Sequence, residues 1–119
     1  MDVNNCTDIP DEIELLEFFE SEPIESYPND GFWSYERGDI NGALLRLSFN
    51  IIEKSIQSSL YLNGDEVMSV SYEGVNKIDI IEEKGVKILK CECGSLISKT
   101  TLKVFFEPKL YIEWQSLGA

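Results

Sequence analysis

The residues Cys91-Glu92-Cys93 form the local motif whose residue types and spacing come closest to a chemical site. On a strand, the two thiols would point to one face and Glu92 to the other, an arrangement that could hold a soft metal or form a redox pair. A metal site needs further Cys or His ligands, but the sequence has no histidine, and Cys6 is its only other cysteine. The redox alternative lacks the two-residue spacing and the helix N-terminus that usually lower a thiol pKa. We therefore expect both thiols to be small core residues, without metal or cofactor.

The second candidate for chemistry is a group of carboxylates, Asp30, Glu36 and Asp39, which lie around Trp33 and Tyr35 in the sequence. Acid and base roles need two carboxylates a few ångströms apart in a cleft, with one of them desolvated. No feature of the sequence supplies such a cleft, and the absence of histidine removes the commonest general base. We expect no enzyme activity, and an enzyme that uses these carboxylates or the thiols is the weakest alternative.

Negative charge is concentrated at the beginning of the chain. The formal net charge is −12 over 119 residues, and the segment from Met1 to Glu36 has eleven acidic residues and no basic one. All ten Lys and Arg residues follow from Arg37 onward and nearly balance the acids there. A field of this sign repels phosphate backbones, so we expect no direct nucleic-acid binding. It attracts basic surfaces, which are common among nucleic-acid-binding proteins and nucleases.

The composition is that of a globular protein. A hydrophobic fraction of 43% can fill a core, and the length predicts a single domain over residues 1–119. No apolar run approaches the roughly 20 residues of a membrane span, so we expect no membrane contact. The first residues show no secretory signal, and three cysteines are too few for a disulfide scaffold. These features indicate a cytoplasmic protein with free thiols.

The pattern of the first third predicts one helix followed by a loop. Asp8 or Ile9 can cap the helix, with Pro10 in its first turn. The expected buried stripe and the expected acidic ridge are separate on a helical wheel: Leu15, Leu16 and Phe19 form the first, and Glu14, Glu17 and Glu20 form the second. Residues 21–23 should end the helix, and the segment EPIESYPNDG, residues 22–31, is typical of an irregular loop.

After Gly31 the sequence consists of short apolar or alternating runs separated by turn residues. Leu45, Leu47 and Phe49, for example, can lie on one face of a strand. The fold class predicted is α+β: an N-terminal helix and loop (residues 9–31), then a mostly antiparallel, meander-like sheet (residues 32–117) of about six to eight short strands, able to curl into a half-barrel. The eight candidate runs are residues 32–37, 43–51, 54–62, 66–74, 76–82, 86–93, 96–107 and 109–115.

The Asn63-Gly64 pair is the strongest hairpin signal, and it leaves two registers open. A two-residue loop would place Leu60 opposite Val67. A three-residue loop would instead align Ile56, Ser58 and Leu60 with Tyr72, Val70 and Met68. We favour the second register, because a slip by one residue turns every side chain to the opposite face.

Aromatic residues gather in two places. Strand alternation puts Trp33, Tyr35 and Arg37 on one face, and these residue types dominate binding hot spots. The alternative is that Trp33 and Tyr35 belong to the core. The second group is expected to build the core and the seat of the helix: Phe105, Phe106, Tyr111 and Trp114.

The run LLEFFESEPIESYPNDGFWSYERGD, residues 15–39, resembles the opening of small bacterial proteins encoded beside polymorphic or contact-dependent growth inhibition toxins. The length, acidity and lack of a catalytic set over the whole chain are similar to those of the immunity proteins of such systems. The resemblance implies a tight complex with one cognate toxin domain, frequently a nuclease, inside the cell that must be protected.

These observations predict an immunity protein that neutralises a basic toxin domain, a nuclease of the RNase or tRNase class, and that is a monomer or weak dimer when free. The acidic third would steer the partner toward the interface. The alternative is a structural or assembly subunit whose acids only keep it soluble. The expected partner-binding residues are Glu14, Glu17, Glu20, Glu22, Glu25, Asp30, Trp33, Tyr35, Glu36 and Asp39.

Overall fold

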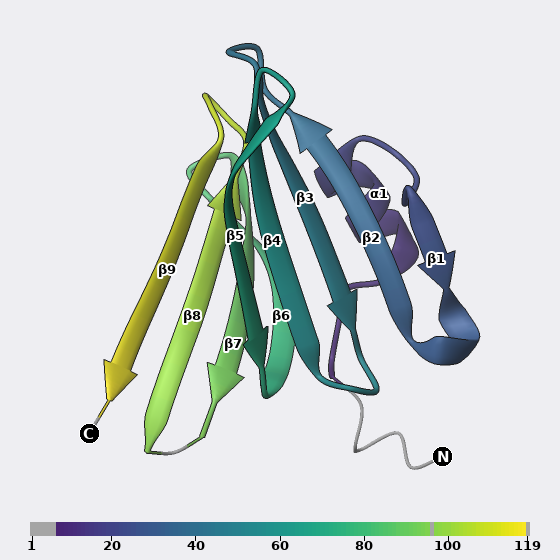
Figure 1. The fold of residues 1–119 in the computed structure, drawn as a ribbon, viewed down its shortest axis with the longest axis vertical. Coiled ribbons are helices and arrows are strands. Elements are labelled where there is room, and N and C mark those ends of the chain that lie inside the picture. The colour runs from purple at the N-terminus through teal and green to yellow at the C-terminus, as the bar shows by residue number, and fades with distance from the viewer. Residues whose placement is uncertain (1–6, 96, 119) are drawn as a thin grey trace.

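The computed structural model describes residues 7–95 and 97–118, so Cys6 lies outside the described residues. One helix precedes nine strands (Figure 1). In chain order the elements are α1 (Glu12–Phe19), β1 (Glu25–Tyr27), the 3-10 turn η2 (Pro28–Asp30), β2 (Phe32–Gly38), β3 (Ala43–Asn50), β4 (Ser55–Leu62), β5 (Asp65–Glu73), β6 (Val75–Glu83), β7 (Val86–Gly94), β8 (Ser98–Phe105) and β9 (Tyr111–Gly118).

The strands form two antiparallel sheets, each ordered as the chain runs. The first sheet has the order β1-β2-β3-β4-β5 and the second has the order β6-β7-β8-β9. The predicted α+β class, with a helix followed by an antiparallel meander, is therefore confirmed. The meander divides at Gly74, where a φ of +80° lets the chain pass directly from β5 to β6. Within the described residues the sheets do not close into a barrel.

The two sheets share one core. Their inner faces contribute strand residues such as Leu45 and Leu47 from β3 and Leu89 from β7, all fully buried. Polar contacts also join the sheets: the indole Nε1 of Trp114 donates to Ser58 Oγ at 3.2 Å. The Trp114 ring stacks on Tyr72 with centroids 5.8 Å apart. Trp114 thus packs against the core, as predicted for the second aromatic group. For Phe105 and Tyr111 the prediction is wrong, because Tyr111 is 41% exposed and stacks on Phe105 outside the core.

The hairpin between β4 and β5 has the register that we favoured. Ile56 pairs with Tyr72, Ser58 with Val70, and Leu60 with Met68. The connection itself is nevertheless the short one, because Leu62 pairs with Asp65 around Asn63-Gly64 and a bulge after Leu60 absorbs the extra residue. The register is therefore the one that keeps the alternating apolar side chains on the inner face. The bulge makes it compatible with the two-residue turn.

The beginning of the helix differs from the prediction. The N-cap is Asp11, not Asp8 or Ile9, and Pro10 precedes the cap. Asp11 Oδ1 accepts from the Glu14 N–H at 2.8 Å, and the Glu14 carboxylate accepts from the Asp11 N–H at 3.3 Å. Asp8 cannot act as the cap because its carbonyl accepts a hydrogen bond from the Ile78 N–H in β6.

The buried face of the helix also differs from the prediction. The residues that pack on the sheets are Leu15, Phe18 and Phe19, each at most 2% exposed, whereas Leu16 is 38% exposed. Phe18 replaces Leu16 because its ring meets that of Phe106 edge-on, with centroids 5.4 Å apart. Phe106 therefore forms the seat of the helix, as predicted.

The segment after the helix is more regular than the loop predicted for residues 22–31. Strand β1 pairs with β2, with Glu25 opposite Ser34 and Tyr27 opposite Phe32. The η2 turn follows β1 directly. Phe19 ends the helix, and Glu20 takes a left-handed conformation as its C-cap. The acidic segment is thus held against the edge of the first sheet. The one helix in the described part of the chain is too short to cross a membrane.

Candidate interaction surface

The acids of the first third form an exposed surface over α1, β1 and η2. At Glu25 it extends around the sheet edge onto the face opposite the helix, because Glu25 pairs with Ser34 and shares its face. We call this surface the acidic face and define it by its exposed members: Glu12, Glu14, Glu17, Glu20, Glu22, Glu25 and Asp30. The capping box fixes the start of the helix, which carries the first three, and Glu20 follows as its C-cap. Strand β1 holds Glu25 at the sheet edge. Six of these seven acids were predicted to bind the partner. The exception is Glu12.

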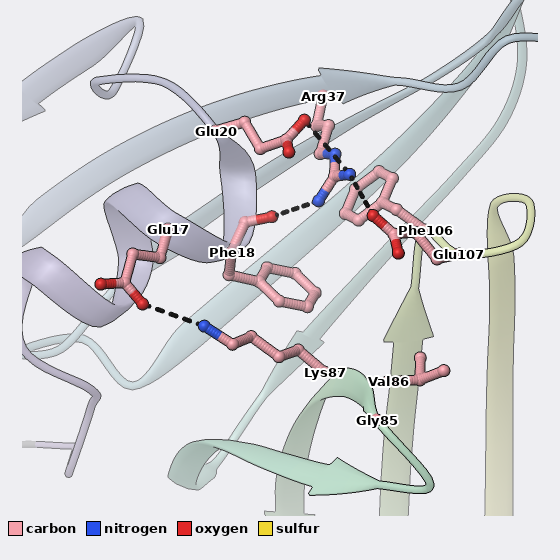
Figure 2. Close-up of a pocket in the computed structure, with 9 residues that line it drawn as sticks. All are labelled: Glu17, Phe18, Glu20, Arg37, Gly85, Val86, Lys87, Phe106 and Glu107. Carbon is pink, nitrogen blue, oxygen red and sulfur yellow. Dashed lines mark hydrogen bonds and ion pairs between the residues drawn. The ribbon is translucent and has the colours of Figure 1, made fainter.

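Arg37 fastens the C-terminal end of the helix to the sheet (Figure 2). Its Nη1 donates to the carbonyl oxygen of Phe18 at 2.7 Å, and its guanidinium carbon lies 4.5 Å from the centre of the Phe106 ring. Its Nη2 lies 3.3 Å from a Glu20 oxygen and 3.6 Å from a Glu107 oxygen. A cation at this position satisfies a carbonyl that the helix leaves without a partner, and it complements the helix dipole.

Some of the acidic face is neutralised by these and similar contacts. Lys87 Nζ lies 2.9 Å from Glu17 Oε2, and this hydrogen bond raises the pKa of the lysine (Figure 2). Glu17 and Glu20 are therefore paired. The remaining acids make no ion pair with any residue in the described ranges: Glu12, Glu14, Glu22, Glu25 and Asp30. The uncompensated charge thus lies at the beginning of the helix, in the segment between α1 and β1, and on β1 and η2.

Glu36 lies on the opposite face of the first sheet from the helix. Its carboxylate is 2.7 Å from Arg46 Nη2 and also accepts from Arg46 Nε, which raises the pKa of the arginine. Arg46 in turn lies over the ring of Tyr61, with its guanidinium carbon 5.5 Å from the ring centre. Glu36 therefore belongs to a cross-strand cluster between β2 and β3. Of the acidic face, Glu25 lies on this side of the sheet, and its charge also acts on Arg46.

Asp39 holds two parts of the backbone together. Its Oδ1 accepts from the N–H groups of Asn41 at 2.9 Å and Ala43 at 3.1 Å. Its Oδ2 accepts from the Leu110 N–H at 3.1 Å, just before β9. The bond from Leu110, followed by that from Asn41, holds the pKa of this carboxyl below its ordinary value. Asp39 thus joins the β2–β3 turn to the second sheet.

This role predicts a pH-dependent contribution to stability. Because the pKa of Asp39 is lower in the folded state, its carboxylate stabilises the fold above the unfolded pKa, about 4, and the contribution is lost as the pH falls through the folded value. We expect Asp39→Asn to lower the melting temperature at pH 7 and the difference from wild type to shrink between pH 5 and pH 3. Thermal unfolding followed by circular dichroism measures this, with the exposed Asp65→Asn as control. A difference that stays constant with pH would contradict the assignment.

The two aromatic residues of β2 have different environments. Tyr35 is 2% exposed and stacks on Phe19, with centroids 4.6 Å apart, so in the free protein its side chain belongs to the core. Burial first, and then the charges of Glu12 and Glu22, raise the pKa of Tyr35 to about 12. Trp33 is partly exposed, and it borders a cleft of about 120 Å³ between α1 and β1.

The apolar residues of this surface were missed by the sequence analysis. Ile13 is 67% exposed, Leu16 38% and Ile24 44%, all within the acidic segment. Leu16 lines the same cleft as Trp33. A signal was available for Ile13, because it is an apolar residue outside the predicted buried stripe of an otherwise acidic helix.

The cysteine pair lies away from this surface, in β7. Both thiols are buried and face the core, with their sulfur atoms 3.7 Å apart. The hydrogen bond that the Cys91 thiol donates to Cys93, together with burial, raises the pKa of Cys91. This agrees with the expected packing role. Among the described residues no cluster of three potential metal ligands is present.

Comparison with known proteins gives one informative similarity. No family model matches the chain, and no curated protein sequence matches it. Among solved structures, the chain is similar to a chain of a contact-dependent growth inhibition toxin–immunity protein complex from Klebsiella pneumoniae 342. The TM-score is 0.88 and the sequence identity 26%, over 94% of this chain and 98% of that chain. The similarity confirms, over almost the whole length, the resemblance to contact-dependent growth inhibition systems that residues 15–39 indicate.

Proposed function

We propose that this chain is the immunity protein of a contact-dependent growth inhibition system, which binds a cognate toxin domain and neutralises it. The observation that carries the proposal is the similarity, at a TM-score of 0.88 and nearly full coverage of both chains, to a chain of a toxin–immunity protein complex. At 26% identity the likeness extends to the sequence as well as the fold. A shared fold with matching length supports a shared role in such a complex.

The charge supports the inhibitor role over the toxin role. A toxin that acts on nucleic acid must bind a polyanion, and a net charge of −12 with an acidic face opposes that binding. The same charge favours binding to a protein that has a basic groove. The finer proposal is therefore that the toxin is a basic nuclease of the RNase or tRNase class, met in the cytoplasm, and that the acidic face steers the encounter.

Not all of the predicted partner-binding residues are retained in the proposed surface. The acids of the helix and of the β1–η2 segment are retained, and so is Trp33, because they are accessible. Tyr35 is buried, Asp39 is occupied by backbone N–H groups, and Glu36 is neutralised by Arg46. Glu12 is added because it is exposed and has no ion pair among the described residues.

The proposal is tested with the toxin domain encoded beside this chain. Cells that express the toxin domain should grow only when this protein is also made, and the two purified proteins should form a complex that survives size-exclusion chromatography. An immunity protein from an unrelated system serves as the specificity control. Growth arrest despite expression of the folded protein, with no complex formed, would refute the proposed function.

The steering role predicts a kinetic effect of the acidic face. Four of its five unpaired acids can be neutralised together as Glu12→Gln, Glu22→Gln, Glu25→Gln and Asp30→Asn, while Glu14 is kept because it caps the helix. This variant should associate with the toxin roughly tenfold more slowly at low salt and show a flatter salt dependence. Dissociation should change by less than about threefold, since rim charges act mainly on the association rate. Stopped-flow binding at several salt concentrations measures both rates.

The matched control removes the same charge elsewhere. Asp65, Glu66, Glu73 and Glu83 are exposed, and none forms an ion pair with a described residue. Changing Asp65 to Asn and the other three to Gln alters the net charge equally, so it should slow association much less. If both variants slow association to the same extent, net charge alone accounts for the effect and the acidic face is not the steering surface.

A further inference from the structure

The solvent-facing side of α1 has an apolar centre that the fold itself does not use. Ile13 and Leu16 are three residues apart and therefore neighbours on the helix surface. They are 67% and 38% exposed, while the opposite side of the helix is fully buried through Leu15, Phe18 and Phe19. Ile13 and Leu16 thus contribute little to holding the helix in place, and they expose apolar surface at the centre of a charged region.

The apolar surface continues from the helix toward β1. Leu16 lines the cleft of about 120 Å³ between α1 and β1 together with Pro23 and Trp33. Ile24, next to Pro23, is 44% exposed. Clusters of exposed apolar side chains, as opposed to single ones, mark surfaces that are covered by a partner. The cleft gives this surface a recess that one apolar side chain of a partner can enter.

The charges around the cleft define the chemistry of the partner. Glu12 and Glu22 line it, and neither forms an ion pair with a residue in the described ranges. Covering these carboxylates with an apolar or acidic surface would remove water from unpaired charges, which is strongly unfavourable. A surface whose Lys or Arg side chains surround an apolar one would pair both carboxylates and cover Leu16 at the same time.

We propose that Ile13 and Leu16, with Trp33 at the adjoining cleft, are the anchor of the interface with the basic toxin domain. This inference rests on the proposed function. The two kinds of residue act at different stages: the surrounding acids accelerate the encounter, and the apolar side chains retain the partner once water is excluded from them. Central apolar contacts ringed by polar ones are the usual anatomy of a binding hot spot.

The experiment measures binding of the Ile13→Ala/Leu16→Ala double variant to the purified toxin domain encoded beside this chain. Alanine is a better helix former than either residue, so the fold should be retained. We expect the dissociation rate to rise by about 30-fold or more, with the association rate within about threefold of wild type. The matched control, Val67→Ala/Leu117→Ala, removes two exposed apolar side chains that are 53% and 66% exposed on edge strands, and it should leave both rates nearly unchanged.

The outcomes separate this inference from the proposed function. If the wild-type protein neither binds nor protects against the toxin, the proposed function fails. If wild type binds and protects, and the folded double variant dissociates no faster than the control, the anchor is elsewhere and only this inference is overturned. Analytical ultracentrifugation of the free protein tests whether a second copy of this chain covers the surface instead of the toxin. A wild-type dimer that becomes monomeric in the double variant would assign this face to self-association and overturn the inference.

Discussion

Replacing Phe19 with alanine is expected to lower the free energy of unfolding by about 3–5 kcal/mol, the cost typical of truncating a buried aromatic residue. The ring is 1% exposed, stacks on Tyr35 and meets the edge of Phe18 at a centroid distance of 5.0 Å. Its removal leaves a cavity between α1 and the sheets that the surrounding rings cannot fill. The melting temperature should fall by roughly 10–20 °C, measured by thermal or urea unfolding.

The control for this prediction is Leu16→Ala on the same helix. Because Leu16 is 38% exposed, its truncation should change the free energy of unfolding by less than about 1 kcal/mol. The two variants therefore separate the buried side of the helix from the solvent-facing side. If Leu16→Ala destabilised the protein as much as Phe19→Ala, the helix would be rotated from its position in the structure, and Leu16 would not be available to a partner.

The orientation of this helix shows where prediction from the sequence alone reaches its limit. Leu15 and Phe19 fit two stripes of similar width, one completed by Leu16 and the other by Phe18. Helical periodicity does not distinguish them. The choice depends on Phe106, which lies just after β8 and meets Phe18 edge-on. Such a contact becomes visible only when the distant strand has been placed.

The strands were predictable because alternation and turn residues are local signals. The run from Ala43 to Asn50 alternates clearly, and its inward residues are those buried in the structure. The register of the β4–β5 hairpin was predictable for a related reason: one slip would expose the whole inward set. The bulge after Leu60 was not predicted, because in a regular hairpin the two-residue loop and the observed register exclude each other.

For the candidate surface, the sequence indicated the charge but not its pairing. Eleven acids without a base predict an acidic face wherever the segment lies. That Lys87 and Arg37 neutralise Glu17 and Glu20 depends on the β6–β7 turn and β2 lying beside the helix. Likewise, Asp39 was predicted as a partner-binding acid, and the bond from the distant Leu110 N–H to its Oδ2 depends on the position of the segment before β9.

Changing Arg37 to glutamine is expected to lower the free energy of unfolding by about 2–3 kcal/mol. The Arg37 side chain is 15% exposed, and its guanidinium donates to the Phe18 carbonyl and lies over the Phe106 ring. A hydrogen bond from a charged donor contributes about 1.5–3 kcal/mol, and a partly desolvated cation–π contact about 1 kcal/mol. Glutamine is shorter and uncharged, so it should lose the ring contact and leave the helix carbonyl without its partner.

The carboxylates around Arg37 should contribute much less than the carbonyl and the ring. Glu20 and Glu107 are 65% and 72% exposed, and solvent-exposed ion pairs are worth about 0–1 kcal/mol. We therefore expect Glu20→Gln and Glu107→Gln each to cost less than about 1 kcal/mol, while Arg37→Lys, which keeps the charge but not the planar fork, costs about 1–2 kcal/mol. Urea unfolding at low and high salt distinguishes the contributions. The contrary result would be a loss of stability in Arg37→Gln that disappears at high salt and that Glu20→Gln and Glu107→Gln together reproduce. It would show that Arg37 stabilises the fold through its ion pairs and not through the helix end.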